Sequence, residues 1–428
     1  MAAEIYQDAT PGDKRGPIFG DVEKVAGFFK MAGILGFVGL IVAAALGGVA
    51  KDGHISGLNL VFQSYTYGYI FWLMFSLGCL GVQILASMLR ATWAIAILRV
   101  AEAGASNLRY LFFLGLPLIA SMFFGEQMGF HLYHWTSPEA KLDPVLVFKS
   151  PYLNNVAVLL RYLLFFGIWI YYYTYLAEGK NGTHTQERTP DEKTANALAQ
   201  NRVNVAAPGF LVFGITITFF FTDMVMSLDP HWFSTIYGVW WGMAGVSSAI
   251  ALGVIFLTSF HNRKPYDSIV TPALTKDLGN MMFGMTMLWG YFSISQALIY
   301  WSGNLPEYVT FYYARFQGPM ATLGFAIVLG QFFTPFLLLL SGRTKRTPHI
   351  LRNVAIIIIS VRIVDIWYQV IPFFNRSLTD VTAIAVDLAA WALVGGVWVT
   401  LFAMHYRRSV PVVSYDTRLQ EAKLDAGH

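Results

Sequence analysis

The sequence predicts an all-α polytopic membrane protein, and three features carry that prediction. Of its 428 residues, 56% are hydrophobic and only 13% are charged, whereas soluble domains carry about 25% charged residues. The mean hydropathy is +0.52. Ten apolar stretches are long enough to cross a bilayer, because a hydrocarbon core of about 30 Å needs roughly 20 helical residues.

Ten transmembrane helices are therefore expected, flanked by two polar ends. The apolar stretches lie near residues 27–50, 67–89, 109–130, 155–177, 206–227, 237–260, 279–301, 319–341, 353–372 and 381–405. This divides the chain into a cytoplasmic segment (1–26), a membrane domain (27–405) and a cytoplasmic tail (406–428). The first segment lacks the pattern of a cleaved signal peptide, so we expect it to be retained.

The distribution of lysine and arginine predicts the orientation. Counting the boundary residue Arg109 with its loop, the N-terminus, the loops after even-numbered spans and the C-terminal tail hold 21 of the 29 basic residues, and the loops after odd-numbered spans hold 5. The remaining 3 lie inside spans. Because basic residues gather on the cytoplasmic side, both termini are expected in the cytoplasm. Between the second and third spans, RATWAIAILRVAEAGASNLR is expected to form an amphipathic helix at the membrane interface.

The order and lengths of the spans suggest an internal repeat. Spans two to five and six to nine have the same in/out order, which predicts two parallel four-helix bundles with two peripheral helices. Placing one bundle on the other brings FFFTDMVMSLDP opposite IVDIWYQVIP. Asp223 then matches Asp365, each a few residues before a proline.

The residue types in the chain exclude several functions. A single cysteine, Cys79, rules out four-cysteine iron–sulfur ligation, CxxCH haem attachment and intrachain disulfides. None of the nine histidines lies in the middle third of a span, so axial ligation of a b-type haem is not expected. No phosphate loop, nucleophile–base set or zinc motif is present, and no basic patch suggests nucleic acid. The chain is expected to bind no metal or redox cofactor of its own.

The stretch FFFTDMVMSLDPHWFST (219–235) places Asp223 behind three phenylalanines, with Asp229 and His231 close after it. An ionisable residue inside a span costs about 2.5–3.5 kcal/mol at mid-membrane and often marks a function. Estimated from the helical rise, six charged residues lie in the middle or outer half of the membrane. They are Glu126, Arg161, Asp223, Arg362, Asp365 and Asp387.

These charges are expected to pair or to line a polar cavity. Arg161 with Glu126 or Asp223, and Arg362 with Asp365, are the pairs that depth and spacing allow. One interpretation makes them structural ion pairs and interfacial anchors, and it is favoured for Asp387, near the end of its span. The other makes the set a cavity that opens outward, for which Gln296 and Gln331 could supply further polar lining.

Histidines near the outer ends of the spans allow three interpretations. His131 and His134 are one turn apart at the end of span three, and His231 is expected on the same side. They could bind a metal or an outer-face haem, but such residues more often bond to loop backbone. If quinol chemistry occurs here, one of them could instead accept a proton from a quinol hydroxyl.

The ten spans, the cytoplasmic termini and the paired bundles resemble the polysulfide-reductase/NrfD-like family of membrane subunits. The stretch DMVMSLDPHWFSTIYG (223–238) is similar to the F-type subunits of alternative complex III, bacterial quinol:cytochrome c oxidoreductases. The resemblance covers almost the whole chain. No quinone-pocket His/Asp pair of the family can be matched onto it residue by residue.

The resemblance implies a respiratory complex in the bacterial inner membrane. Its expected partners are a C-type NrfD-like membrane subunit, an iron–sulfur subunit, and multihaem and monohaem c-type cytochromes, which hold the haem c and the iron–sulfur clusters. Menaquinone or menaquinol is a further expected contact. Whether this subunit is itself catalytic is left open by the residues.

Three functions remain as alternatives. In the first, a redox-complex subunit carries protons, with Asp223 and Asp365 as relay groups, Glu126 and Asp387 as secondary ones, and Arg161 and Arg362 as their partners; Asp229 and His231 would form the mouth of this path. The second is a secondary transporter with proton-coupled carboxylates. The third is a scaffold whose charges are structural.

Overall fold

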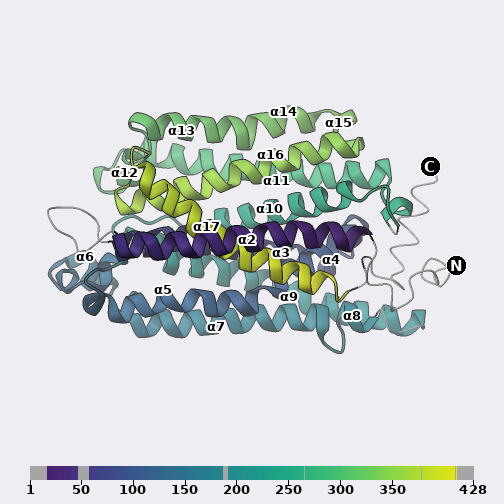
Figure 1. The fold of residues 1–428 in the computed structure, drawn as a ribbon, viewed down its shortest axis with the longest axis horizontal. Coiled ribbons are helices and arrows are strands. Elements are labelled where there is room, and N and C mark those ends of the chain that lie inside the picture. The colour runs from purple at the N-terminus through teal and green to yellow at the C-terminus, as the bar shows by residue number, and fades with distance from the viewer. Residues whose placement is uncertain are drawn as a thin grey trace.

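The computed structural model describes residues 17–46, 57–186, 191–264, 266–376, 378–409 and 411. Most of the predicted cytoplasmic segment 1–26 and of the tail 406–428 therefore lies outside the described residues. The described chain is helical, without strands, and its long helices run side by side along one axis (Figure 1). The predicted fold class, a polytopic helical membrane protein, is confirmed.

The long helices match the predicted spans closely. They are α2 (Pro17–Leu46), α3 (Gly57–Leu89), α5 (Leu108–Met128), α7 (Asn155–Tyr173), α9 (Glu192–Met224), α10 (Tyr237–Ser259), α11 (Pro272–Gly303), α13 (Gly318–Val328) continued by α14 (Thr334–Leu340), α16 (Pro348–Val370) and α17 (Val381–Tyr406). Shorter helices lie at their ends: α4 (Thr92–Ser106), α6 (Pro144–Lys149), α8 (Thr183–Gln186), α12 (Pro306–Tyr313) and α15 (Gly342–Arg346).

Nine helices within the described ranges are both long and apolar enough to cross a membrane. The remaining expected span, the seventh in the chain (279–301), corresponds to α11, which has 32 residues and runs beside α10 and α14 (Figure 1). It is less apolar because Asn280, Ser293 and Gln296 interrupt its hydrophobic residues. Two of these polar residues, Ser293 and Gln296, line a cavity.

The helices form two groups of four, as the repeat predicts. In the first group α3, α5, α7 and α9 pack in a ring, and in the second α10, α11, α14 and α16 do the same. Each group starts with its most buried helix: the most apolar window of α3 is 89% buried and that of α10 is 72% buried. The outer helices α2 and α17 pack along each other and against α3.

The two groups meet where α3 crosses α10. Gly78 and Gly245 bring the two backbones into direct contact, and a Cβ on Gly78 would lie 2.0 Å from the Gly245 carbonyl oxygen. No side chain fits between them. The close approach explains why both positions are glycine and fixes the two groups against each other.

The start of α2 and the end of α17 lie at the same end of the bundle (Figure 1, right). Phe19 contacts Tyr406 there, with ring centroids 5.8 Å apart, and Glu23 pairs with Arg407. We call this the inner end, because the basic residues predict that it faces the cytoplasm. The opposite, outer end carries α6 and α12.

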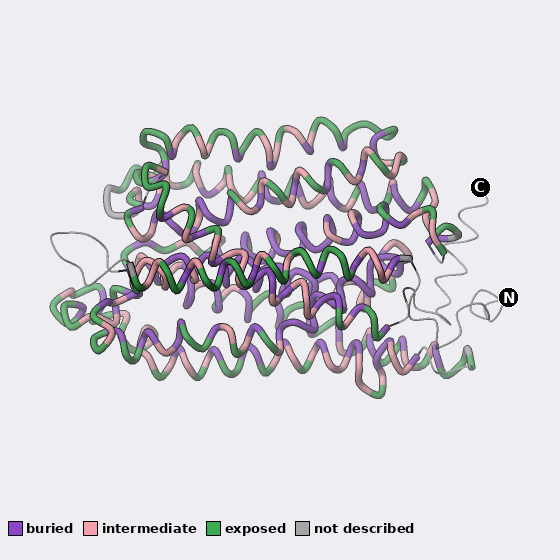
Figure 2. The backbone as a smooth tube through the Cα atoms, in the orientation of Figure 1, coloured by how far each residue is buried: buried purple, intermediate pink, exposed green. Residues whose placement is uncertain are grey.

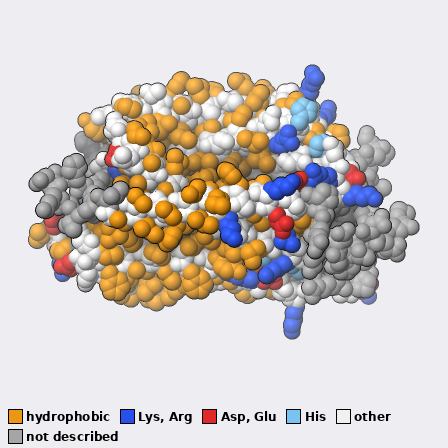
Figure 3. Space-filling view, viewed as in Figure 1, with side chains coloured by type: hydrophobic (Ala, Val, Ile, Leu, Met, Phe, Trp, Pro, Cys, Tyr) orange, Lys and Arg blue, Asp and Glu red, His pale blue; other side chains and the backbone are white. Residues whose placement is uncertain are grey.

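The surface agrees with a protein in a bilayer. Figure 3 shows a broad hydrophobic band, with lysine and arginine gathered toward the inner end. On α2 the side chains of Phe28, Leu35 and Phe37 are exposed, whereas α3 is buried along its length (Figure 2). Lipid rather than water is the solvent that such an exposed apolar helix face requires.

The helix expected at the membrane interface is instead buried. Every residue of α4 from Ala94 to Ser106 is buried, and the helix packs against α3, α10 and α17. The interfacial prediction was wrong because Arg99 and Glu102, which supplied its polar face, form an ion pair inside the protein. A charge that is paired and hydrogen-bonded can be buried at a tolerable cost.

Candidate functional site

A cavity of about 370 Å³ lies in the outer half of the second helix group. It is bounded by α10, α11, α12, α13 and α16. Most of its wall is apolar or aromatic, and its polar residues include Ser293, Gln296, Arg315, Asp365 and Gln369. Its rim includes Ile294 and Phe325, which are more than half exposed on the apolar surface. The cavity therefore opens toward the bilayer, as a site for a lipid-soluble molecule would.

Asp365 presents a carboxylate oxygen to this cavity. It lies on α16 with only 1% of its surface exposed, and its Oδ2 accepts a hydrogen bond from Arg362 Nη1 at 2.6 Å. This is the i,i+3 pair that the sequence predicts. The other oxygen, Oδ1, makes no hydrogen bond, and the side chains of Trp289 and Gln369 lie close to the carboxylate. Arg362 thus holds one oxygen, and the other has no partner in hydrogen-bond geometry.

Two more buried polar atoms around the cavity make no hydrogen bond. They are the hydroxyl of Tyr237 and Nε1 of Trp289. A buried polar group without a partner costs about 1–3 kcal/mol, and native proteins keep few of them. Three such atoms around one cavity favour a polar ligand that bonds to them.

The π-turn between α13 and α14 positions Arg362. Leu329–Phe333 forms this turn just before Pro335, whose ring removes a backbone donor. With its amide oriented to suit its neighbours, Gln331 accepts from Arg362 Nη2 at 2.5 Å and donates to the Ile358 carbonyl oxygen. Such turns often occur at functional sites. Gln331 thus supports the arginine behind the cavity rather than lining the cavity.

Arg315 supplies a positive charge at the outer end of the cavity. It is 2% exposed, lies 3.6 Å over the ring of Phe311, and donates to the carbonyl oxygens of Tyr368 and Gln369 at 3.1 and 2.8 Å. Burial lowers its pKa to about 10, so it stays cationic at neutral pH. Sequence reasoning missed it, counting it only as a loop residue. Its setting among aromatic residues, FYYARF, was the available signal.

At the matching position in the first helix group, the carboxylate of Asp223 has no unbonded oxygen. Asp223 accepts two hydrogen bonds from Arg161, from Nε at 2.7 Å and from Nη2 at 3.0 Å. The guanidinium also lies 3.9 Å over the ring of Tyr152. A second cavity of about 330 Å³ lies beside this pair and is lined by Tyr152 and Ser227, among others, but not by Asp223. The predicted Arg161–Asp223 pair is present, and both carboxylate oxygens are occupied.

Glu126 is exposed on α5 and does not pair with Arg161. Asp387 is fully buried: it accepts from Ser64 Oγ at 2.5 Å, Trp367 Nε1 at 2.8 Å and Arg376 Nη2 at 2.9 Å. The ion pair with Arg376, which folds inward from the loop before α17, fits the structural interpretation of Asp387.

The outer histidines are bonded to loops. His231 Nε2 lies 2.6 Å from Asp143 Oδ2, and Asp229 accepts from the His231 backbone amide at 3.3 Å. His131 Nδ1 lies 3.4 Å from Thr136 Oγ1. His134 approaches His231, with ring centroids 6.5 Å apart. Among the described residues, no group of three or more His, Cys, Asp or Glu side chains could hold a metal ion.

The Asp143–His231 contact makes the stability of the outer loops depend on pH. The hydrogen bond from His231 lowers the pKa of Asp143 below its ordinary value. A carboxyl whose pKa is lowered by folding stabilises the fold above its unfolded pKa of about 3.9 and loses that effect as the pH falls through the folded value. In Asp143→Asn the unfolding temperature in detergent should fall at neutral pH, and its difference from wild type should shrink as the pH falls below about 3.9 and through the lowered pKa of Asp143. A difference that persists there would contradict this assignment.

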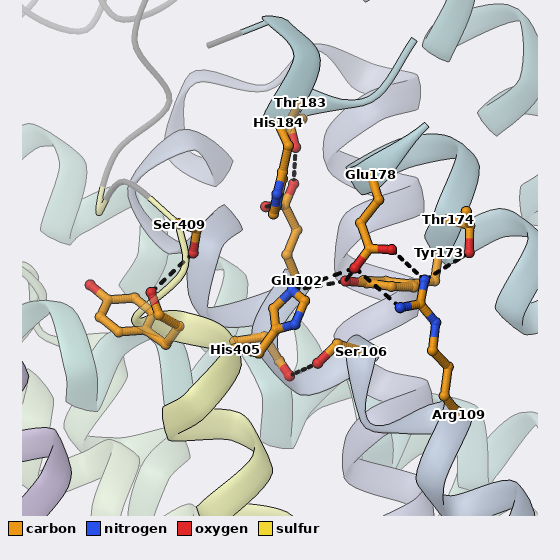
Figure 4. Close-up of polar contacts among 12 residues, drawn as sticks. Glu102, Ser106, Arg109, Tyr173, Thr174, Glu178, Thr183, His184, His405 and Ser409 are labelled. Carbon is orange, nitrogen blue, oxygen red and sulfur yellow. Dashed lines mark hydrogen bonds and ion pairs between the residues drawn. The ribbon is translucent and has the colours of Figure 1, made fainter. Parts of the chain in front are cut away.

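Sequence reasoning missed a third cluster of charges, at the inner end. Glu102, Glu178, His184 and His405 gather from four helical segments that are distant in sequence (Figure 4). Nothing in the spacing of these residues could have shown that they meet.

Comparison with known proteins adds no relative: no protein-family model matches the chain, and no curated protein does.

Proposed function

We propose that this multi-pass membrane protein is a subunit of a bacterial respiratory quinol:cytochrome c oxidoreductase. In this proposal it carries protons in the outer half of the inner membrane and contacts menaquinol, while partner subunits hold the haem c and iron–sulfur clusters. The single observation that carries it is Asp365, whose free Oδ1 faces a cavity that opens to the bilayer. The resemblance of residues 223–238 supplies the redox context.

The geometry suits proton transfer at Asp365. Arg362 holds one carboxylate oxygen, which fixes the orientation of the other toward the cavity. A quinol that entered from the bilayer would place a hydroxyl near Oδ1, and a carboxylate within hydrogen-bond reach can accept that proton. Arg315, with its positive charge at the outer end, favours a negative charge on the reacting oxygen. The proton would then leave toward the outer loops.

A purely structural role is supported for two other predicted relay carboxylates. Asp223 and Asp387 each have both oxygens occupied by hydrogen-bond donors. A proton on Asp223 would compete with Arg161, and a proton on Asp387 would compete with Ser64 at one oxygen or with Trp367 and Arg376 at the other. Their assignment as relay groups stays a prediction, and a scaffold function for the chain is the second candidate.

Isolation of the intact assembly tests the proposed function. The chain would be purified through an affinity tag from membranes dissolved in mild detergent, and a reduced-minus-oxidised visible spectrum recorded. We expect a c-type haem signal from co-purifying cytochromes, because this chain has no CxxCH sequence to attach haem. A folded chain that is isolated alone, without haem, would overturn the proposal and favour a transporter.

A further inference from the structure

The inner cluster joins residues from five parts of the fold. Helix α4 supplies Arg99 and Glu102, and α5 supplies Arg109. Tyr173 is at the end of α7, and Glu178 is in the π-turn that follows it. Thr183 and His184 are on α8, and His405 is on α17; Figure 4 shows these residues except Arg99. Together they form a continuous set of titratable side chains. The set starts at a buried carboxylate and ends at the inner surface.

Glu102 forms the buried end of the cluster. Its side chain is 1% exposed, pairs with Arg99, and accepts a hydrogen bond from Thr183 Oγ1 at 2.5 Å. His184 Nε2 lies 3.4 Å from Glu102 Oε2, and this nitrogen has no hydrogen-bond partner. A proton gained at His184 Nε2 would therefore lie directly beside the Glu102 carboxylate.

His405 lies between the two carboxylates. Its ring is 6.1 Å from the ring of His184, and its Nε2 is 2.9 Å from the Tyr173 hydroxyl and 3.9 Å from Glu178 Oε1. The Tyr173 hydroxyl donates its only proton to Glu178 Oε1 at 2.8 Å. In the contact between His405 Nε2 and the Tyr173 hydroxyl oxygen, the hydrogen must therefore come from Nε2. Nδ1 of His405 then carries no hydrogen and can gain a proton.

One edge of the cluster is exposed at the inner surface. Glu178 pairs with Arg109, and their side chains are 29% and 37% exposed. Arg109 also donates to Thr174 and lies 4.9 Å over the ring of Tyr173. The set therefore extends from the inner surface to a carboxylate that is almost fully buried.

The fixed charges within the cluster cancel, and a further buried cation, Arg202 of α9, bonds beside it to Gln186 and to the Asn181 carbonyl oxygen. Two arginines, Arg99 and Arg109, balance two carboxylates, Glu102 and Glu178, when both histidines are neutral. One added proton then gives a single positive charge that both carboxylates favour. A second would place two charged rings about 6 Å apart in a low-dielectric setting, where like charges repel strongly. The histidine pair is built to hold one proton.

We propose that His184 and His405, between Glu102 and Glu178, form a proton-exchange site at the inner end that binds a single proton shared by the two rings. The site is separate from the outer cavity and takes its proton from inner water through the exposed edge at Glu178. Its role in supplying protons to the complex rests on the proposed function, but the binding of the proton does not.

Histidine NMR on the purified full chain in nanodiscs tests the site directly. The nine histidines would be labelled with nitrogen-15, and His184→Gln and His405→Gln would assign the two signals. Between about pH 5 and pH 8, where histidine titrates, we expect the two rings together to gain one proton. His184→Gln should let His405 alone take a whole proton over the same range.

Removal of the Glu178 carboxylate gives a second test, in which the direction of the change is predicted. At the pH where His405 is half protonated, Glu178→Gln should reduce its protonated fraction about fivefold, because loss of an opposite charge within about 4–6 Å moves a titration by about one pH unit or more. Glu178 is part-exposed, so this variant leaves no buried arginine unpaired. Glu139→Gln and His349→Gln, exposed residues outside the cluster, serve as matched controls and should change neither signal.

Three results would overturn the site: full and independent charging of both rings, no titration of either ring in this range, or an unchanged His405 in Glu178→Gln. The functional arm uses the intact complex in vesicles, where His405→Gln should slow proton uptake from the inner side severalfold. A shared proton found in a chain without redox partners would refute the proposed function alone. Failure of the NMR result would refute the site alone.

Discussion

Asp365→Asn should lower quinol oxidation by the intact complex about 100-fold, with the complex still assembled. A positioned proton acceptor contributes roughly 10²–10⁴-fold to a rate, and asparagine keeps the size of the side chain and an acceptor oxygen for Arg362 but cannot take a proton. The measurement is reduction of the cytochrome acceptor by a menaquinol analogue, together with the ratio of protons released to electrons transferred.

Asp223→Asn is the matched control for that prediction. It makes the same chemical change at the corresponding position of the first helix group, where both carboxylate oxygens bond to Arg161. If Asp365 is special because of its free oxygen, Asp223→Asn should reduce the rate far less. An unchanged rate and proton-to-electron ratio in both variants would refute a proton path through these carboxylates.

Arg376→Met should destabilise the protein by about 3–5 kcal/mol, the usual effect of removing one partner of a buried ion pair. Asp387 would keep its bonds from Ser64 and Trp367 but lose the positive charge that compensates it. The measurement is the unfolding temperature in detergent, or the denaturant midpoint where unfolding is reversible.

Two variants make this prediction specific to the buried pair. The double variant Arg376→Met with Asp387→Leu should regain most of the lost stability, because both charges then leave the interior together. Arg263→Met breaks the exposed pair with Asp21 and should change stability by about 1 kcal/mol or less. A single and a double variant with equal losses would show that Arg376 acts through packing alone.

The membrane fold could be predicted from the sequence because hydropathy and length decide where helices cross. The Arg362–Asp365 pair could also be predicted, since residues three apart on a helix share a face. Arg161 and Asp223 were paired by estimated depth, and the structure contains that pair. In each case the prediction needs only the spacing of residues along one helix or their depth in the membrane.

The features that sequence reasoning missed depend on how loops and helices pack. Arg376 and Arg315 precede α17 and α13, so counting charges placed them in outer loops, yet both fold inward and are buried. Glu126 has the depth of a buried acid but lies on the exposed face of α5. Depth alone does not tell which way a side chain faces around a helix axis.

The contact between Gly78 and Gly245 limits how this molecule can work. Transport by alternating access generally requires one half of a protein to rock against the other about a central site. Here the two halves touch backbone to backbone at this one crossing, with no side chain between the two glycines. A rocking motion of one half against the other would have to break that contact, whereas proton transfer between fixed side chains would leave it intact.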